Sequence, residues 1–176
     1  GQAWNAITVG GYTRKVVIDD PGADHYEPVA PNGGLSPYST TSLTWENSMP
    51  IKPEVVFEAG NVGKDKYSCA GLNSLKLLTT HHDISERHFS TFEATSAATA
   101  LAANFSARIL HEYPNLWPET VRALMIHSAE WTDAMKEQFT DPRKTDKHNA
   151  KRLARCVGFG APSVNRALSS LKNSVV

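Results

Sequence analysis

A segment rich in small and apolar residues constrains the fold of this 176-residue chain more than any other part of its sequence. Within it, apolar side chains recur every four positions or lie beside those positions: Ala97, Ala98, Leu101, Ala102, Phe105, Ile109 and Leu110. This spacing is typical of a helix with one face in a hydrophobic core. We therefore expect a core-facing helix over about Ser96 to His111, which ends before Pro114.

Short apolar segments elsewhere in the sequence are typical of buried strands. They are NAITVGGY (residues 5–12), EVVFEAG (54–60) and LNSLKLLTT (72–80). A second helix is expected to begin at Pro118, because proline is favoured in a first helical turn, and a last helix follows the Gly-rich turn in VGFGAPSVNRAL (157–168). Strands that alternate with helices predict an α/β fold with parallel strands.

Two segments between these elements differ from them in composition. Residues 19–50 are rich in Pro, Gly and Ser, and so long a loop is unusual in a compact domain. We expect that this loop either carries function or packs on polypeptide absent from the chain. Residues 133–155 are highly charged, and the simplest interpretation of their Lys and Arg side chains is a solvated face rather than a nucleic-acid interface.

The overall composition argues against several classes of partner and scaffold. The 18 basic and 18 acidic side chains cancel, so no overall field favours nucleic acid, an anionic membrane or an acidic substrate. No apolar run approaches the ~20 residues of a membrane-spanning helix. Cys69 and Cys156 lack a CxxC spacing, which excludes a disulfide-rich scaffold and favours two idle thiols over a single bridge.

Ser96 lies where the predicted central helix begins, and two interpretations of it are open. Its side-chain oxygen, or that of Thr95, can cap free N–H groups of the first turn. Alternatively, an exposed serine at this position has free N–H groups and the positive end of the helix dipole beside any negative charge that develops on a substrate oxygen. That arrangement suits a nucleophile, although periodicity alone favours the cap.

Several segments together resemble the catalytic domain of the subtilisin-like serine proteases. ATSAATALAANFSARIL (94–110) resembles the family's Gly-Thr-Ser-x-Ala segment, in which the catalytic serine opens a buried helix. The remaining landmarks occur in the family's order: NAITVGGY for its Val-Gly-Ala strand, SPYSTTS for its Ser-rich turn, KPEVVFEAG for its Lys-Pro-Asp-Val strand and VGFGAPSVNRAL for its late Gly-rich turn and helix. The resemblance implies a doubly wound, mainly parallel sheet with flanking helices. It also implies that residues 1–176 are the C-terminal portion of a subtilisin-like peptidase domain, with a charged surface insertion at about 133–155.

The resemblance favours the nucleophile interpretation of Ser96. It implies that Ser96 attacks peptide bonds through an acyl-enzyme, that its backbone N–H is one arm of the oxyanion hole, and that Thr95 is the threonine of the motif. Two residues depart from the family's pattern. Ala94 replaces a Gly that permits a positive-φ turn, a change that costs about 1 kcal/mol, and Ala100 replaces an optional Pro.

The resemblance also implies that the other catalytic groups lie elsewhere. In this family the catalytic Asp and His, and the side-chain amide of the oxyanion hole, belong to motifs upstream of the NAITVGGY strand. We therefore expect that the chain alone is inactive and that it associates with a missing N-terminal half of the same domain or with a second copy. A non-catalytic binding or scaffolding module of the same fold is the alternative, and Ala94 favours it.

Other candidate residues within the chain fit a catalytic role less well. Asn61 in EAGN resembles the oxyanion amide, but its place after KPEVV argues against that role. The histidine-rich residues 81–88 lack the family's His-Gly-Thr motif and a metal-ligand spacing, so we expect a surface loop near the cleft. His127 is expected to be partly exposed. Asp133 and His148 follow Ser96 as in α/β-hydrolases, but the Gly-x-Ser-x-Gly motif of that fold is absent.

The resemblance carries further expectations about partners and location. The substrate is a polypeptide, and neither an organic cofactor nor a catalytic metal is needed. Structural calcium is common in the family, but no compact carboxylate cluster identifies a site. No nucleic-acid and no membrane partner is expected, and similarity to intracellular bacterial subtilases implies a cytoplasmic bacterial protein.

Overall fold

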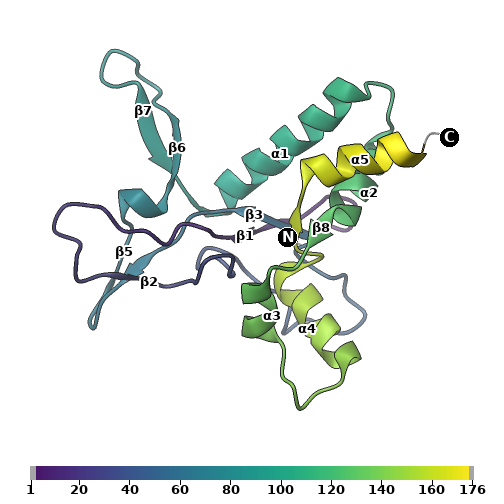
Figure 1. Ribbon diagram of the computed structural model, residues 1–176, viewed down its shortest axis with the longest axis horizontal. Helices are drawn as coiled ribbons and strands as arrows, with labels where there is room; N and C mark the ends of the chain where they lie inside the picture. Colours follow the sequence, from purple (N-terminus) through teal and green to yellow (C-terminus); the bar gives the residue numbers. More distant parts are fainter. Residues whose placement is uncertain (1–2, 175–176) are drawn as a thin grey trace.

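The computed structural model describes residues 3–174, with side chains as far as residue 171, and has helices on both faces of a parallel strand pair (Figure 1). The helices are α1 (Ala94–Glu112), α2 (Pro118–His127), α3 (Asp133–Phe139), α4 (Asp146–Val157) and α5 (Val164–Ser174). The four-residue strands are β1 (Val9–Tyr12), β3 (Val55–Glu58), β6 (Leu77–Thr80) and β7 (Phe89–Phe92). The shorter elements are β2 (Glu27–Pro28), β4 (Gly63–Lys64), β5 (Cys69–Ala70), β8 (Ala129–Glu130), β9 (Ala161–Pro162) and the 3-10 helix Asn73–Leu75.

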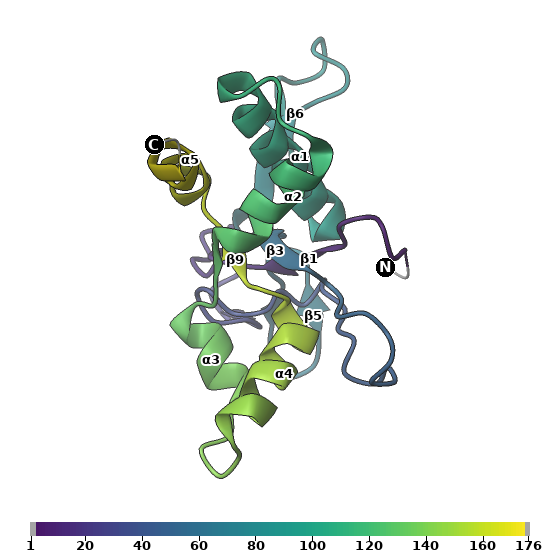
Figure 2. The ribbon, with the colours of Figure 1, turned by 90° about the vertical axis from the view of Figure 1, so that its right-hand side faces the viewer.

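β1 and β3 form the centre of the fold as a parallel pair, in which Val9 lies beside Val55. Consecutive residues of a strand point to opposite faces. Val55 therefore packs with α1, α2 and α5 on one face, whereas Val56 packs with α3 and α4 on the other. Figure 2 shows these two helical layers above and below the strands. A strand covered on both faces is apolar throughout, which explains the run EVVFEAG.

The predicted fold class agrees with the structure in part. A mixed α/β arrangement with a parallel pair between helical layers is confirmed. The larger doubly wound sheet is not seen within residues 3–174, where the other paired strands are antiparallel. Segment 72–80 does contain β6, but β6 pairs with β7 in a hairpin that projects from the body of the molecule (Figure 1). Only residues 81–88 join these strands, and this length favours antiparallel pairing, because parallel strands need a longer crossover connection.

The two helices with the clearest apolar spacing form where the sequence predicts them. α1 begins two residues before Ser96 and ends one residue beyond His111. Its buried side chains are Ala97, Ala98, Ala102, Phe105 and Ile109. Leu101 and Leu110 were expected on or beside this face, but they are exposed. α2 has Pro118 in its first turn and buries Val121 and Met125.

Residues 133–155 form α3 and most of α4. The hydroxyl of Thr132 and that of Thr145 each accept a hydrogen bond from the backbone N–H three residues later, which caps both helices. Met135 and Leu153 belong to the core beneath β3. The charged segment therefore covers one face of the strand pair in addition to facing solvent.

Arg155 contradicts the expectation of a solvated basic face. Its side chain is only 5% exposed, because the last turn of α4 packs against the loop at residues 42–46. There the Arg155 guanidinium donates to the backbone carbonyls of Ser42 and Glu46. Contacts across more than a hundred residues of sequence are not visible in the local charge pattern.

The long loop at residues 19–50 packs on the body of this chain, whereas we expected function or absent polypeptide to explain it. Ser36 Oγ donates to the carbonyl of Gly60 at 2.7 Å, and the backbone N–H of Ser42 donates to the carbonyl of Arg155 at 2.8 Å. These bonds satisfy polar groups that a buried loop would otherwise leave unpaired.

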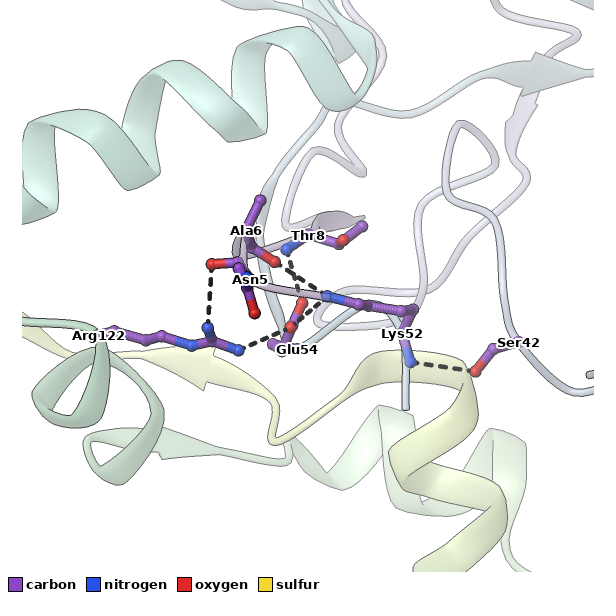
Figure 3. A network of polar contacts seen from close by, with 7 residues as sticks. All are labelled: Asn5, Ala6, Thr8, Ser42, Lys52, Glu54 and Arg122. Carbon is purple, nitrogen blue, oxygen red and sulfur yellow. Dashed lines mark hydrogen bonds and ion pairs between the residues drawn. The ribbon is translucent and has the colours of Figure 1, made fainter. Parts of the chain in front are cut away.

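A network of charged side chains around Glu54, the residue before β3, connects this strand to α2 (Figure 3). Lys52 Nζ lies 2.5 Å from Glu54 Oε1, and both side chains are buried. Arg122 of α2 reaches the same oxygen at 3.2 Å, while Glu54 Oε2 accepts a hydrogen bond from the backbone N–H of Thr8. Lys52 also donates to the carbonyl of Ala6 at 2.9 Å. Each buried charge therefore has both an opposite charge and a hydrogen-bond partner, which burial requires.

Candidate active site

Ser96 is the third residue of α1, and its side chain is exposed. Its hydroxyl makes no hydrogen bond to any residue in the described part of the chain. The N-cap of the helix is Glu93, which has an extended backbone and forms no side-chain cap. The cap interpretation of Thr95 and Ser96 is therefore wrong. The first-turn N–H groups beside Ser96 have no partner within the helix, as at any helix N-terminus.

Ala94 precedes the serine in a left-handed conformation. Its φ is +68°, and among the described residues no other non-glycine has a positive φ. The backbone N–H of Ala94 donates to the carbonyl of Ala59 at 2.9 Å, so the loop that follows β3 meets the start of α1 at this turn. A side chain in this conformation costs about 1–2 kcal/mol. The position where the resemblance expects Gly is thus one where the backbone favours Gly.

Two polar side chains, Lys76 and Tyr38, lie beside the carboxylate of Glu93, the residue before this turn. Lys76 Nζ lies 3.2 Å from Glu93 Oε2. Burial, together with the neighbouring Glu93 carboxylate, raises the pKa of the Tyr38 hydroxyl to about 12. The sequence analysis missed this group, because the three residues are far apart in sequence and belong to no motif. A charged residue, Glu93, three residues before the start of the predicted helix was the only local signal.

Asn61 is fully buried, and its amide is occupied by structural hydrogen bonds. Its Oδ1 accepts from the backbone N–H groups of Ala30 and Val62 at 3.1 and 2.9 Å. Its Nδ2 donates to the carbonyls of Lys15 and Ala30 at 2.8 and 2.9 Å. Both amide protons are used, so no donor remains for an oxyanion. The structure agrees with the sequence argument against a catalytic role.

The histidines at residues 81–88 lie in the turn of the β6–β7 hairpin, as the sequence predicts for a surface loop. His81 Nδ1 lies 2.9 Å from the carbonyl oxygen of Asp83, and its Nε2 is 4.0 Å from a carboxylate oxygen of Glu86. The rings of His81 and His82 are 4.3 Å apart. None of these side chains is hydrogen-bonded to Ser96 in the structure.

The remaining acid and base candidates lie on other elements. His127 ends α2 and is exposed. Asp133 and His148 lie in the first turns of α3 and α4, on the opposite face of the β1–β3 pair from α1. An arrangement of these residues with Ser96 as in the α/β-hydrolases is therefore not formed.

The described residues contain no obvious metal or disulfide site. Among them, no three His, Cys, Asp or Glu side chains come together in a way that suits a metal ion. Cys69 is a free, exposed thiol, and Cys156 is free and buried, with a pKa that burial raises to about 11. None of the described helices combines the length and apolar character needed to cross a membrane.

The geometry around Ser96 can be compared with known proteins. The model of the subtilase family of peptidases matches residues 1–160. This range includes the β1–β3 pair, the turn at Ala94 and the whole of α1 with Ser96. No curated protein and no solved structure matches the chain. Because the family match covers almost the whole sequence, the chain belongs to the subtilase family of subtilisin-like proteases.

Proposed function

We propose that Ser96 is the nucleophile of a serine endopeptidase. The observation that supports this role best is an exposed hydroxyl without a hydrogen-bond partner among the described residues, at the start of α1 in a chain of the subtilase family. Ser96 Oγ attacks the carbonyl carbon of a peptide bond and transfers its proton to an imidazole. The C–N bond then breaks, the imidazole gives the proton to the leaving amine, and water hydrolyses the acyl-enzyme.

The start of α1 supplies electrostatic stabilisation in this proposal. Negative charge develops on the carbonyl oxygen during attack, and the backbone N–H of Ser96 is one donor to it. The first-turn N–H groups and the positive end of the helix dipole favour that charge. Such preorganised donors need no ordering at the moment of reaction, so a 19-residue helix with one face in the core, such as α1, is a suitable support.

We propose that the general base and its orienting carboxylate come from polypeptide outside these 176 residues. The described histidines support this, because no hydrogen bond joins any of them to Ser96. In this proposal residues 1–176 are the C-terminal portion of the peptidase domain. The missing groups are provided by the N-terminal portion of the same domain or by a second copy of the chain.

A non-catalytic subtilase-like binding module is the second candidate. The left-handed Ala94 favours it, since a strained turn beside the nucleophile changes the position of Ser96 relative to a substrate. Both candidates share a polypeptide ligand, and neither needs an organic cofactor or a metal. We place the protein in the cytoplasm in both cases, because two free thiols are typical of a reducing compartment.

The proposal is tested by peptide hydrolysis with the full-length protein, as the cell makes it. The unmodified protein is expected to cleave an unfolded polypeptide, and Ser96→Ala is expected to reduce turnover by about a millionfold. Ser106→Ala is the matched control, because Ser106 lies on the same helix with its hydroxyl bonded to the carbonyl of Ala102. A folded protein that binds polypeptide and leaves it intact would favour the non-catalytic module.

The need for further polypeptide is tested separately. The 176-residue chain alone is expected to be inactive, and addition of the N-terminal portion in trans is expected to restore hydrolysis. Hydrolysis by the isolated chain as a monomer, abolished by Ser96→Ala, would show that a base lies within it. That result would leave the nucleophile assignment intact and overturn only the proposed origin of the base.

A further inference from the structure

Arg155 is a buried cation without a buried anion. Its guanidinium donates from Nη1 to the carbonyl of Ser42 at 2.9 Å and from Nη2 to the carbonyl of Glu46 at 3.1 Å. Neither acceptor carries a charge, and the described part of the chain gives Arg155 no ion pair. A buried charge is costly unless an opposite charge accompanies it. The pairs at Lys52 and Glu54 show that this protein compensates buried charges elsewhere.

A cavity of 350 Å³ lies beside this guanidinium, between α4 and the loop at residues 43–47. Its lining residues are Leu43, Trp45, Asn47, His148, Lys151, Arg152 and Arg155. No carboxylate is among them, so the cavity has three permanent positive charges and an imidazole on its wall. Trp45 and Leu43 add an apolar surface. The volume lies within the range of about 300–1,000 Å³ that is typical of small-molecule sites.

The basic side chains of this cavity remain available to a ligand. Arg152 is exposed and takes part in no hydrogen bond or ion pair with another described residue. Lys151 Nζ donates one hydrogen bond, to Asn47 Oδ1 at 2.6 Å, and an ammonium has three donors. Arg155 uses two of its five N–H groups on the carbonyls.

Asp141, an acidic group that interacts electrostatically with Arg152, is committed to a different arginine. Asp141 accepts two hydrogen bonds from the Arg143 side chain, at 3.0 and 3.1 Å. These bonds are the main reason that the pKa of Asp141 lies below its usual range, and Arg152 makes a smaller contribution. Asp141 does not line the cavity. The positive charge there is therefore not neutralised by the described residues that form the wall.

We propose that this cavity binds a small molecule that carries a phosphate group on a flat apolar body. Guanidinium groups pair with phosphate oxygens through two parallel hydrogen bonds, and an ammonium adds a point charge, so Arg152, Arg155 and Lys151 suit a group with more than one negative charge. The Trp45 ring suits the flat apolar part. This site lies on the α4 side of the β1–β3 pair, whereas Ser96 begins α1 on the other side, so it is separate from the proposed protease site.

Calorimetric titration of the purified protein with phenyl phosphate, inorganic phosphate and benzoate at constant ionic strength tests the proposal. Phenyl phosphate is expected to bind at least about tenfold more tightly than inorganic phosphate, because it also contacts the apolar wall, and more tightly than benzoate. Arg152→Ala is expected to weaken phenyl phosphate binding about tenfold or more, through loss of a charge-assisted hydrogen bond. Trp45→Ala is expected to weaken phenyl phosphate binding and to leave inorganic phosphate binding unchanged.

Lys147→Ala is the matched control, because Lys147 is an exposed cation of the same helix that does not line the cavity. This variant is expected to bind phenyl phosphate like the unmodified protein. Equal weakening by Lys147→Ala and Arg152→Ala would indicate general attraction to a basic surface and overturn the site. Absence of phenyl phosphate binding, or equally tight binding of benzoate, would overturn the assignment to a phosphorylated ligand.

Discussion

Replacement of Ala94 by glycine tests the conformation of the turn before Ser96. Ala94 has a φ of +68°, a conformation that costs an L-residue about 1–2 kcal/mol and costs glycine nothing. Glycine also gains conformational freedom in the unfolded chain, which offsets about 0.5–1 kcal/mol of this relief. We therefore expect Ala94→Gly to increase the free energy of unfolding by about 0.5–1 kcal/mol. For a chain of this size the melting temperature would rise by about 1–4 °C.

Ala103→Gly provides the matched control for this measurement. Ala103 is exposed in the middle of α1, where the backbone is helical, so glycine is expected to decrease the free energy of unfolding by about 1 kcal/mol. Urea denaturation monitored by circular dichroism gives both changes, and they should have opposite signs. A loss of stability in Ala94→Gly similar to that in Ala103→Gly would show that the turn is not left-handed and would refute the reasoning.

Four further substitutions test three other parts of the molecule, each by urea denaturation of the folded protein. Because the pKa of Tyr38 is about 12 in the folded protein and 10.0 without burial, the unfolded chain loses this proton first as the pH rises. The unmodified protein is therefore expected to lose more stability between pH 10 and 12 than Tyr38→Phe does, and parallel pH profiles would contradict this shift. Glu54→Ala leaves the Lys52 ammonium buried without an anion and is expected to cost about 3–5 kcal/mol, whereas Arg122→Ala, at the partly exposed end of the network, is expected to cost about 1 kcal/mol or less. Asn61→Ala leaves four backbone groups without their partner and is expected to cost about 3 kcal/mol or more, so a loss below about 1 kcal/mol would contradict a structural role for its amide.

Elements whose pattern is local could be predicted from the sequence. α1 and α2 follow from apolar spacing and from Pro118, and β3 follows from an apolar run that is buried on both faces. The pairing of β6 with β7 and the burial of Arg155 could not be predicted in this way. Both depend on which distant segments come together, and a charged or apolar stretch has the same composition whichever partner it meets.

Only part of the candidate site could be predicted from the sequence. Periodicity alone favoured a cap at Ser96, which is wrong because Glu93 takes the N-cap position and the helix begins earlier. The family resemblance identified Ser96 as a nucleophile, and that role remains a proposal. The same resemblance implied that Ala94 occupies a position suited to glycine, and its left-handed backbone agrees with this expectation. Tyr38 and Lys76 were missed because their proximity to Glu93 is a tertiary contact.

The role of Ser96 as an activated nucleophile is tested most directly by reaction with a fluorophosphonate probe. The full-length protein, as the cell makes it, is treated with the probe, and peptide mass mapping locates the covalent adduct. An unactivated serine reacts poorly, because a hydroxyl without a base is a weak nucleophile. We predict a single adduct on Ser96 that disappears in Ser96→Ala and persists in Ser106→Ala. A folded protein that remains unmodified at Ser96, or that carries its adduct on another serine, would contradict the account.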